Sequence, residues 1–84
     1  MGVRAYMLIT TATGSEYEVL EDILKMSVSS FENVKVEADV VYGVFDLVII
    51  VEAPDLGALD RVVTQLRSHS KITKTTTLIS SRSR

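Results

Sequence analysis

Asp46 is the residue whose position most needs a chemical explanation. It follows Gly43 by three residues and directly precedes five uninterrupted apolar residues, Leu47 to Val51. A charge at the start of such a segment is costly to bury unless it has a partner. The carboxylate could accept hydrogen bonds from an α-ammonium group, while backbone amides near a glycine can approach a carboxylate closely. Alternatively, Asp46 accepts turn amides within its own hairpin, as Asp side chains often do.

Three consecutive threonines lie near the C-terminus. Thr75, Thr76 and Thr77 carry hydroxyl groups, which both donate and accept hydrogen bonds. Threonines are also ordinary strand formers, so they need no ligand to explain them. His69 is a lone histidine in a serine-flanked loop, and the nearby sequence offers no partner for metal binding or general base catalysis. We therefore expect neither a metal nor a cofactor.

Length and composition set the class of protein. With 84 residues the chain has room for one small core, and we assign residues 1–79 to one domain and residues 80–84 to a flexible basic tail. Hydrophobic residues make up 46% of the sequence. That is more apolar surface than so small a core can hide, so we expect the protein to associate with itself.

Net charge, cysteine content and the length of the apolar segments disfavour several classes of protein. A net charge of −2 offers no basic stripe for nucleic acid, and the absence of cysteine removes disulfides and thiolate chemistry. The longest aliphatic run is far shorter than the ~20 residues that span a bilayer. We expect no signal peptide, because the N-terminal residues lack an apolar segment followed by a small-residue cleavage site. We expect a soluble, cytoplasmic protein.

Periodicity predicts four strands. The second alternates cleanly between apolar and charged residues, whereas the first and third are apolar on both alternating sets. The second and third strands are joined across Gly43 by so short a turn that they must form an antiparallel hairpin. The predicted strands are Val3–Thr11, Val34–Tyr42, Phe45–Val51 and Ile72–Ile79.

Two amphipathic helices complete the pattern. Ser15 and Glu18 form a capping box that predicts a helix from Ser15 to about Met26, ended by a run of serines at positions 27, 29 and 30. Pro54 and Asp55 open the second helix, with Asp55 as its N-cap. Its apolar stripe is Leu56, Leu59, Val62, Val63 and Leu66.

The resulting βαββαβ order predicts a ferredoxin-like α+β fold. Its four-stranded antiparallel sheet carries both helices on one face, with the first and third strands central. Either alternating set of those two strands is apolar, so the other face of the sheet also carries apolar side chains. Each one left in water forfeits roughly 1.5–3 kcal/mol. We therefore expect a dimer packed sheet to sheet, with the interface formed by Tyr6, Leu8, Val48 and Ile50.

The segment VYGVFDLVIIVEAPDLGALDRVV, residues 41–63, resembles the signature region of the effector-binding (RAM) domain of the Lrp/AsnC regulators. The shared features are a Gly-x-x-Asp turn ahead of an apolar strand, a helix beginning Asp-Leu, and a last strand with Thr-x-Thr. The resemblance extends from about Ala5 to Ile79. The loop Ser68–Lys71 departs from the Pro-Gly turn common in that family.

The resemblance implies a non-catalytic amino-acid sensor. Members of that family form sheet-to-sheet dimers that assemble further, often into rings of four dimers, and a small effector lodges between dimers. The positions that match the family's effector-binding motifs are Gly43, Val44, Phe45, Asp46, Thr75 and Thr77, with Tyr42 as a weaker addition.

Family regulators usually carry a helix-turn-helix domain ahead of this one, and this sequence has no residues for it. We therefore expect a stand-alone effector domain that does not bind DNA itself. Such a domain would modulate transcription or metabolism through assembly, or by joining a full-length Lrp/AsnC regulator.

Three other functions share this topology. A small ferredoxin-like enzyme is one, although the sequence has no glycine-rich phosphate loop and no nucleophile with a base. An RNA-binding domain would need stacked aromatics on both central strands and a basic surface. An ACT-type amino-acid sensor has the same ligand class, but the Gly-x-x-Asp and Thr-x-Thr motifs favour the Lrp/AsnC type.

Overall fold

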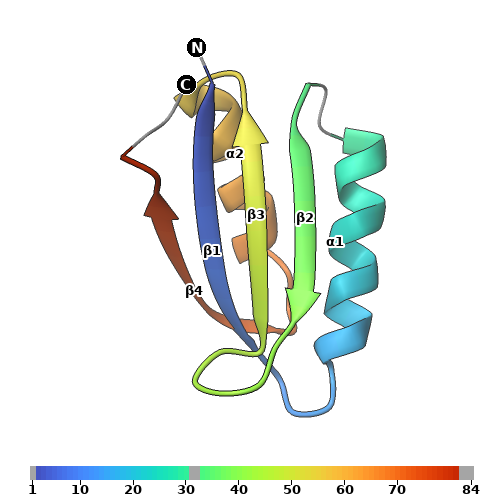
Figure 1. Cartoon of the computed structure of the whole chain (residues 1–84). Helices are drawn as coiled ribbons and strands as arrows, with labels where there is room; N and C mark the ends of the chain where they lie inside the picture. Colours follow the sequence, from blue (N-terminus) through green and yellow to red (C-terminus); the bar gives the residue numbers. More distant parts are fainter. Residues whose placement is uncertain (1, 31–32, 82–84) are drawn as a thin grey trace.

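The computed structural model describes residues 2–30 and 33–81, and its four strands and two helices follow the predicted βαββαβ order (Figure 1). All strand pairs are antiparallel, and the sheet order is β2-β3-β1-β4, which places β1 and β3 in the centre. The ferredoxin-like fold is thereby confirmed. The elements are β1 (Val3–Thr11), α1 (Glu16–Ser30), β2 (Lys35–Val40), β3 (Leu47–Ala53), α2 (Leu56–Arg67) and β4 (Ile72–Ile79).

The first helix is longer than predicted. It continues through the serines to Ser30 instead of ending near Met26. Serine lowers helix stability by only a fraction of a kcal/mol, and no glycine or proline interrupts this stretch, so the helix can continue. Asn33, with a φ of 61°, adopts the left-handed conformation shortly before β2 begins.

The hairpin connection is also longer than predicted. β2 ends at Val40 and β3 begins at Leu47, so residues 41–46 form a loop. The sequence pattern predicted a tight turn in its place. The Val41 amide donates to the Asp46 carbonyl at 2.9 Å and closes this loop. The Asp46 amide donates instead to the Ile9 carbonyl of β1, at 2.8 Å, and the loop is anchored to the central strand.

The other boundaries agree more closely with the sequence. β1 and β4 have the predicted bounds. Asp55 caps α2, because its carboxylate accepts the Ala58 amide at 2.8 Å. The Ser80 amide donates to the Arg4 carbonyl at 2.8 Å, so the first residue of the predicted tail still lies against β1. Residues 82–84 of that tail lie outside the described part of the chain.

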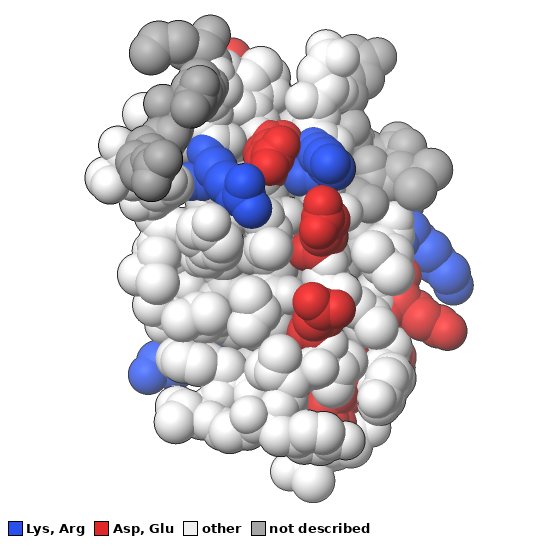
Figure 2. Space-filling view, viewed as in Figure 1, with Lys and Arg blue, Asp and Glu red and all other residues white. Residues whose placement is uncertain are grey.

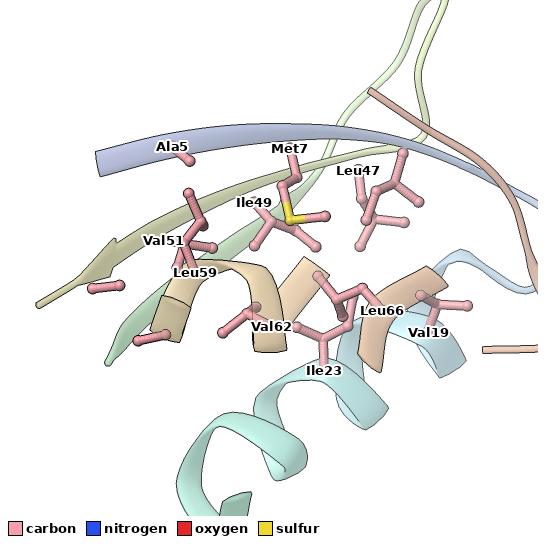
Figure 3. Packing of buried hydrophobic residues seen from close by; sticks show 13 residues of the cluster. Ala5, Met7, Val19, Ile23, Leu47, Ile49, Val51, Leu59, Val62 and Leu66 are labelled. Carbon is pink, nitrogen blue, oxygen red and sulfur yellow. The ribbon is translucent and has the colours of Figure 1, made fainter. Parts of the chain in front are cut away.

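Both helices pack on one face of the sheet. α1 lies against β2, whereas α2 lies against β3, β4 and β1. Figure 3 shows the side chains of the central strands directed toward the helices, with those of the helices directed back. Alternate residues of the two central strands are fully buried in this layer: Ala5, Met7, Ile9, Leu47, Ile49 and Val51.

No helix or strand of the described residues lies over the opposite face of the sheet (Figure 1). The strand register places the four predicted interface residues together there, with Tyr6 opposite Ile50 and Leu8 opposite Val48. These four side chains are half-buried, and Leu78 of β4, opposite Tyr6, is 51% exposed. We call this surface the open face, defined by Tyr6, Leu8, Val48, Ile50 and Leu78.

Charged side chains on the same side of the sheet lie over β2 and at one end of the central strands, where Arg4 forms an ion pair with Glu52. Glu37 and Asp39 of β2 lie opposite Ile50 and Val48 in the register, so they share that side. Figure 2 shows acidic atoms in a row over this part of the sheet and a broad uncharged area beside them, over the other strands. The open face is therefore an apolar area with a border of charged side chains, and the residues along β2 in that border include the acidic Glu37 and Asp39.

Candidate functional site

The loop between β2 and β3 projects two apolar side chains into solvent. Tyr42 is 97% exposed and Val44 is 85% exposed, on either side of Gly43. Gly43 has a φ of 134°, in the region that favours glycine, and this conformation lets the loop turn. Phe45, the next residue, is half-buried. The predicted effector-binding turn is thus an exposed, partly apolar loop end.

Asp46 uses its carboxylate to hold this loop against the central strand. Its Oδ2 accepts the Thr11 amide at 2.8 Å and lies 3.5 Å from the Thr11 hydroxyl. Neither bond lies within the hairpin, so the expectation that Asp46 accepts turn amides of its own hairpin is wrong in this respect. The carboxylate is only half-buried and has further acceptor capacity, because an ionised carboxylate has about four lone-pair positions.

The two predicted threonines lie on the side of the sheet that carries the helices. Thr75 is opposite Ile9 and Thr77 is opposite Met7, whose side chains point toward the helices. Both threonines are half-buried, and both line a groove of about 460 Å³ between α2 and β4. Thr76 lies opposite Leu8 and therefore on the other side of the sheet.

Within one chain, the two halves of the predicted site do not meet. The groove between α2 and β4 includes no residue of the loop 41–46 in its lining. β1 separates them, because Leu47 and Thr75 lie opposite the same residue, Ile9, on different neighbouring strands. Asp46 and the two threonines therefore do not line a common groove within one chain.

His69, which had no evident partner in the sequence, has two in the structure. Its Nε2 lies 2.9 Å from Oδ2 of Asp22 in α1, and its Nδ1 accepts the Lys71 amide at 3.1 Å. Because Nδ1 accepts a hydrogen bond, the ring hydrogen is on Nε2, which donates to the carboxylate. The ring is mostly buried, with a side-chain exposure of 14%. His69 thus joins the loop before β4 to α1.

A second bond supports the same junction. The Lys71 ammonium lies 2.7 Å from both carboxylate oxygens of Glu18. Glu18, predicted to cap its own helix, thus cross-links that helix to the loop before β4. The partners are 47 and 53 residues apart, so no local pattern reveals them. The topology does offer a signal, because α1 begins and β4 begins at the same end of the sheet (Figure 1).

The described residues contain neither a membrane-spanning helix nor a cluster of metal-ligating side chains. In residues 2–30 and 33–81, no helix is long and apolar enough to cross a membrane. No cluster of three or more His, Cys, Asp or Glu side chains suited to holding a metal ion occurs in the same part of the chain.

Comparisons with known proteins agree with this architecture. The family model of the Lrp/AsnC ligand-binding domain matches residues 4–84. The structure of the hypothetical protein PHS023 from Pyrococcus horikoshii is 42% identical, with a TM-score of 0.78 over 93% of this chain and 88% of that one. The structure of TTHA0845 from Thermus thermophilus is 30% identical, with a TM-score of 0.79 over 98% of this chain and 96% of that one.

A more distant likeness adds information about fold. The transcriptional regulator NMB0573 from Neisseria meningitidis, whose structure is a complex with L-Met, is 18% identical. Its TM-score is 0.67 over 93% of this chain and 49% of that one. The comparison with curated proteins found no match.

Proposed function

Since this chain belongs to the Lrp/AsnC ligand-binding domain family, we propose that it is a non-catalytic regulatory module that binds an amino-acid effector and assembles into oligomers. The family match over residues 4–84 is the observation that carries this proposal. Methionine is the first effector to test, because a structural relative was solved in complex with L-Met. The predicted cytoplasmic location remains a prediction.

Assembly is the first part of the proposal. The open face presents four half-buried apolar side chains and the 51% exposed Leu78, and neither helix of the described residues lies over them. Two copies laid face to face would remove these side chains from water, with the axis of a symmetric dimer between them. The acidic residues Glu37 and Asp39 lie toward one border and would remain in the rim, where charges are tolerated.

Effector binding is the second part, and it uses more than one copy. The loop 41–46 and the threonines of β4 are separated by β1 in a single chain, so further association of dimers would have to bring them together. Backbone amides near Gly43 suit the carboxylate of an amino acid, and Asp46 suits its ammonium group. Thr75 and Thr77 would supply hydroxyl groups from the second copy.

The exposed loop end supports this arrangement. Tyr42 and Val44 are almost entirely in water, although such side chains gain about 1.5–3 kcal/mol each when fully buried. Contact with another dimer would bury them and would close the loop over a ligand. A ring of dimers is the arrangement we propose, and a full-length Lrp/AsnC regulator is a candidate partner in it.

The test is a panel of free amino acids, read by thermal unfolding and light scattering. We expect at least one amino acid, with methionine first, to raise the melting temperature or to change the assembly size. Asp46→Ala should remove that response. Glu21→Ala is the matched control, since it removes an exposed carboxylate on α1 and should leave the response intact.

Stability must be separated from binding in this experiment. Asp46→Ala also removes the acceptor of the Thr11 amide, and we expect it to lower the free energy of unfolding by about 1.5–3 kcal/mol. Asp46→Asn keeps an acceptor oxygen but loses the charge, so it should retain most of the stability and still lose the response to ligand. The proposed function would be contradicted if no amino acid of the panel changed the melting temperature or the assembly size of the unaltered protein.

A further inference from the structure

The two edge strands beside the open face differ in charge. β4 adds Lys74 to this side of the sheet, because Lys74 lies opposite Thr10 of β1, whereas its other residues on this side, Thr76 and Leu78, are uncharged. In residues 2–30 and 33–81 Lys74 forms no ion pair. β2 presents two carboxylates and one cation on the same side, and Figure 2 shows the acidic atoms as a row. These β2 residues are Lys35, Glu37 and Asp39.

An ion pair lies at one end of the open face. Arg4 of β1 is opposite Glu52 of β3, and Nη1 of Arg4 lies 3.3 Å from Oε2 of Glu52. The guanidinium also lies over the Tyr6 ring, 5.5 Å from its centroid, so it is held on the side that would meet another copy. The two side chains are 46% and 45% exposed, and both have hydrogen-bonding capacity for a further partner.

A symmetric dimer can stack two open faces in two aligned ways. Its dyad lies between the sheets and runs either nearly along the strands or nearly across them. With the dyad along the strands, the order β2-β3-β1-β4 is reversed in the other copy, so β2 lies over the other β4 and the strands run in the same direction. With the dyad across the strands, each strand lies over its own counterpart and runs in the opposite direction.

Charge separates these two arrangements. With the dyad across the strands, Glu37 and Asp39 of the two copies would face each other, and such juxtaposed like charges are costly. The two Arg4–Glu52 pairs would then lie at opposite ends of the interface. With the dyad along the strands, the acidic edge of each copy lies over the strand that carries Lys74, and both Arg4–Glu52 pairs lie at the same end.

We propose that the second copy lies with its strands running in the same direction, so that the two Arg4–Glu52 pairs meet and Lys74 faces the acidic edge of the other copy. This inference rests on the assembly proposed above and adds the orientation of the copies. Arg4 is then within reach of the partner's Glu52 as well as its own. The apolar side chains drive association, and the charged border selects one orientation.

Charge reversals placed on separate chains test this orientation. Arg4→Glu replaces the pair with two carboxylates, and Glu52→Arg replaces it with two cations. In an equal mixture we expect the heterodimer to associate roughly fivefold to tenfold more strongly than the homodimers, after correction for chance pairing, as a few exposed charge pairs allow. Native mass spectrometry separates the three dimers by mass. Each chain has lost its internal pair, so the preference reports contact between copies.

Arg61→Glu and Glu21→Arg are the matched controls. They make the same changes of net charge at exposed positions of the two helices, and a mixture of them should pair by chance, with heterodimers as half of the dimers. The double variant Arg4→Glu/Glu52→Arg restores the internal pair with its polarity reversed, and it should dimerise about as strongly as the unaltered protein. Higher ionic strength should reduce the preference for the heterodimer.

A mixture of Asp39→Lys and Lys74→Asp tests the edges in the same way. In the heterodimer, positions 39 and 74 of different copies carry opposite charges, whereas each homodimer brings like charges together. We expect a preference of roughly twofold to fivefold, smaller than for the Arg4–Glu52 pair, because both residues are exposed at the rim. Chance pairing in this mixture would show that β2 does not lie over β4 of the other copy.

The outcomes distinguish the orientation from the assembly itself. Chance pairing of the Arg4→Glu and Glu52→Arg chains, in dimers that still form, would overturn the orientation and leave the proposed assembly in place. An equal preference in the Arg61→Glu and Glu21→Arg mixture would also overturn it, because net charge alone would then explain the result. If the unaltered protein formed no dimer, the proposed assembly would fail, and the orientation with it.

Discussion

The two faces of the sheet are built from the same strands but are covered differently. Met7 and Ile49 point toward the helices and are fully buried, whereas their neighbours Leu8 and Ile50 point the other way and are only half-buried. Residue type does not explain the difference, since both sets are large and aliphatic. The two helices cover only one face of the four-stranded sheet. The central strands carry apolar side chains on both faces, so the described residues leave the second apolar face without a covering helix.

The largest expected effect separates the two faces at adjacent positions. Ile49→Ala leaves a cavity beneath the helices and should lower the free energy of unfolding by about 2–5 kcal/mol at any protein concentration. Ile50→Ala, on the open face, should act mainly through association, so its effect should depend on concentration. Urea unfolding at two protein concentrations measures both. If both variants lost the same free energy of unfolding at both protein concentrations, the two faces would not differ in the way described.

A charge placed on the open face should break the dimer. Leu8→Glu would put an unpaired carboxylate among apolar side chains, and we expect it to weaken dimerisation at least a hundredfold, about 2.7 kcal/mol. Thr64→Glu adds the same charge at an exposed position of α2 and serves as the control. Sedimentation velocity reports the difference. Dimers of equal strength in both variants would show that the open face is not the interface.

A smaller effect concerns the rim of the covered face, where polar bonds tie α1 to the loop before β4. Asp22→Ala removes the acceptor of the His69 ring hydrogen and should lower the free energy of unfolding by about 1 kcal/mol. Hydrogen exchange at the Lys71 amide, which donates to the same ring, should become faster. Glu21→Ala, on the same helix, is the control. Unchanged exchange in Asp22→Ala would show that the bond does not hold the loop.

Much of the fold could be predicted because its signals are local. Alternation in Lys35–Val40 marks an edge strand, and Asp55 caps the helix that follows it. The hairpin loop could not be bounded, because Asp46 is held by bonds to Ile9 and Thr11, far away in the sequence. The length of α1 was underestimated because serine disfavours a helix only weakly.

The candidate site was less predictable than the fold. The motif residues were found, but nothing local shows that β1 separates Asp46 from Thr75. Arg67 belongs to no motif, and the groove that it lines exists only because α2 packs beside β4. The partners of His69 and Lys71 likewise depend on tertiary structure, because they are available only where α1 lies near the start of β4. Such contacts follow from tertiary packing, and a single sequence does not encode them in any short pattern.

The mass of the unaltered protein in solution tests the central claim most directly. If a second copy covers the open face, sedimentation equilibrium should give twice the 9.3 kDa mass of the chain, or a larger even multiple, down to low micromolar concentration. A mass of one chain that persists at high concentration would contradict the account.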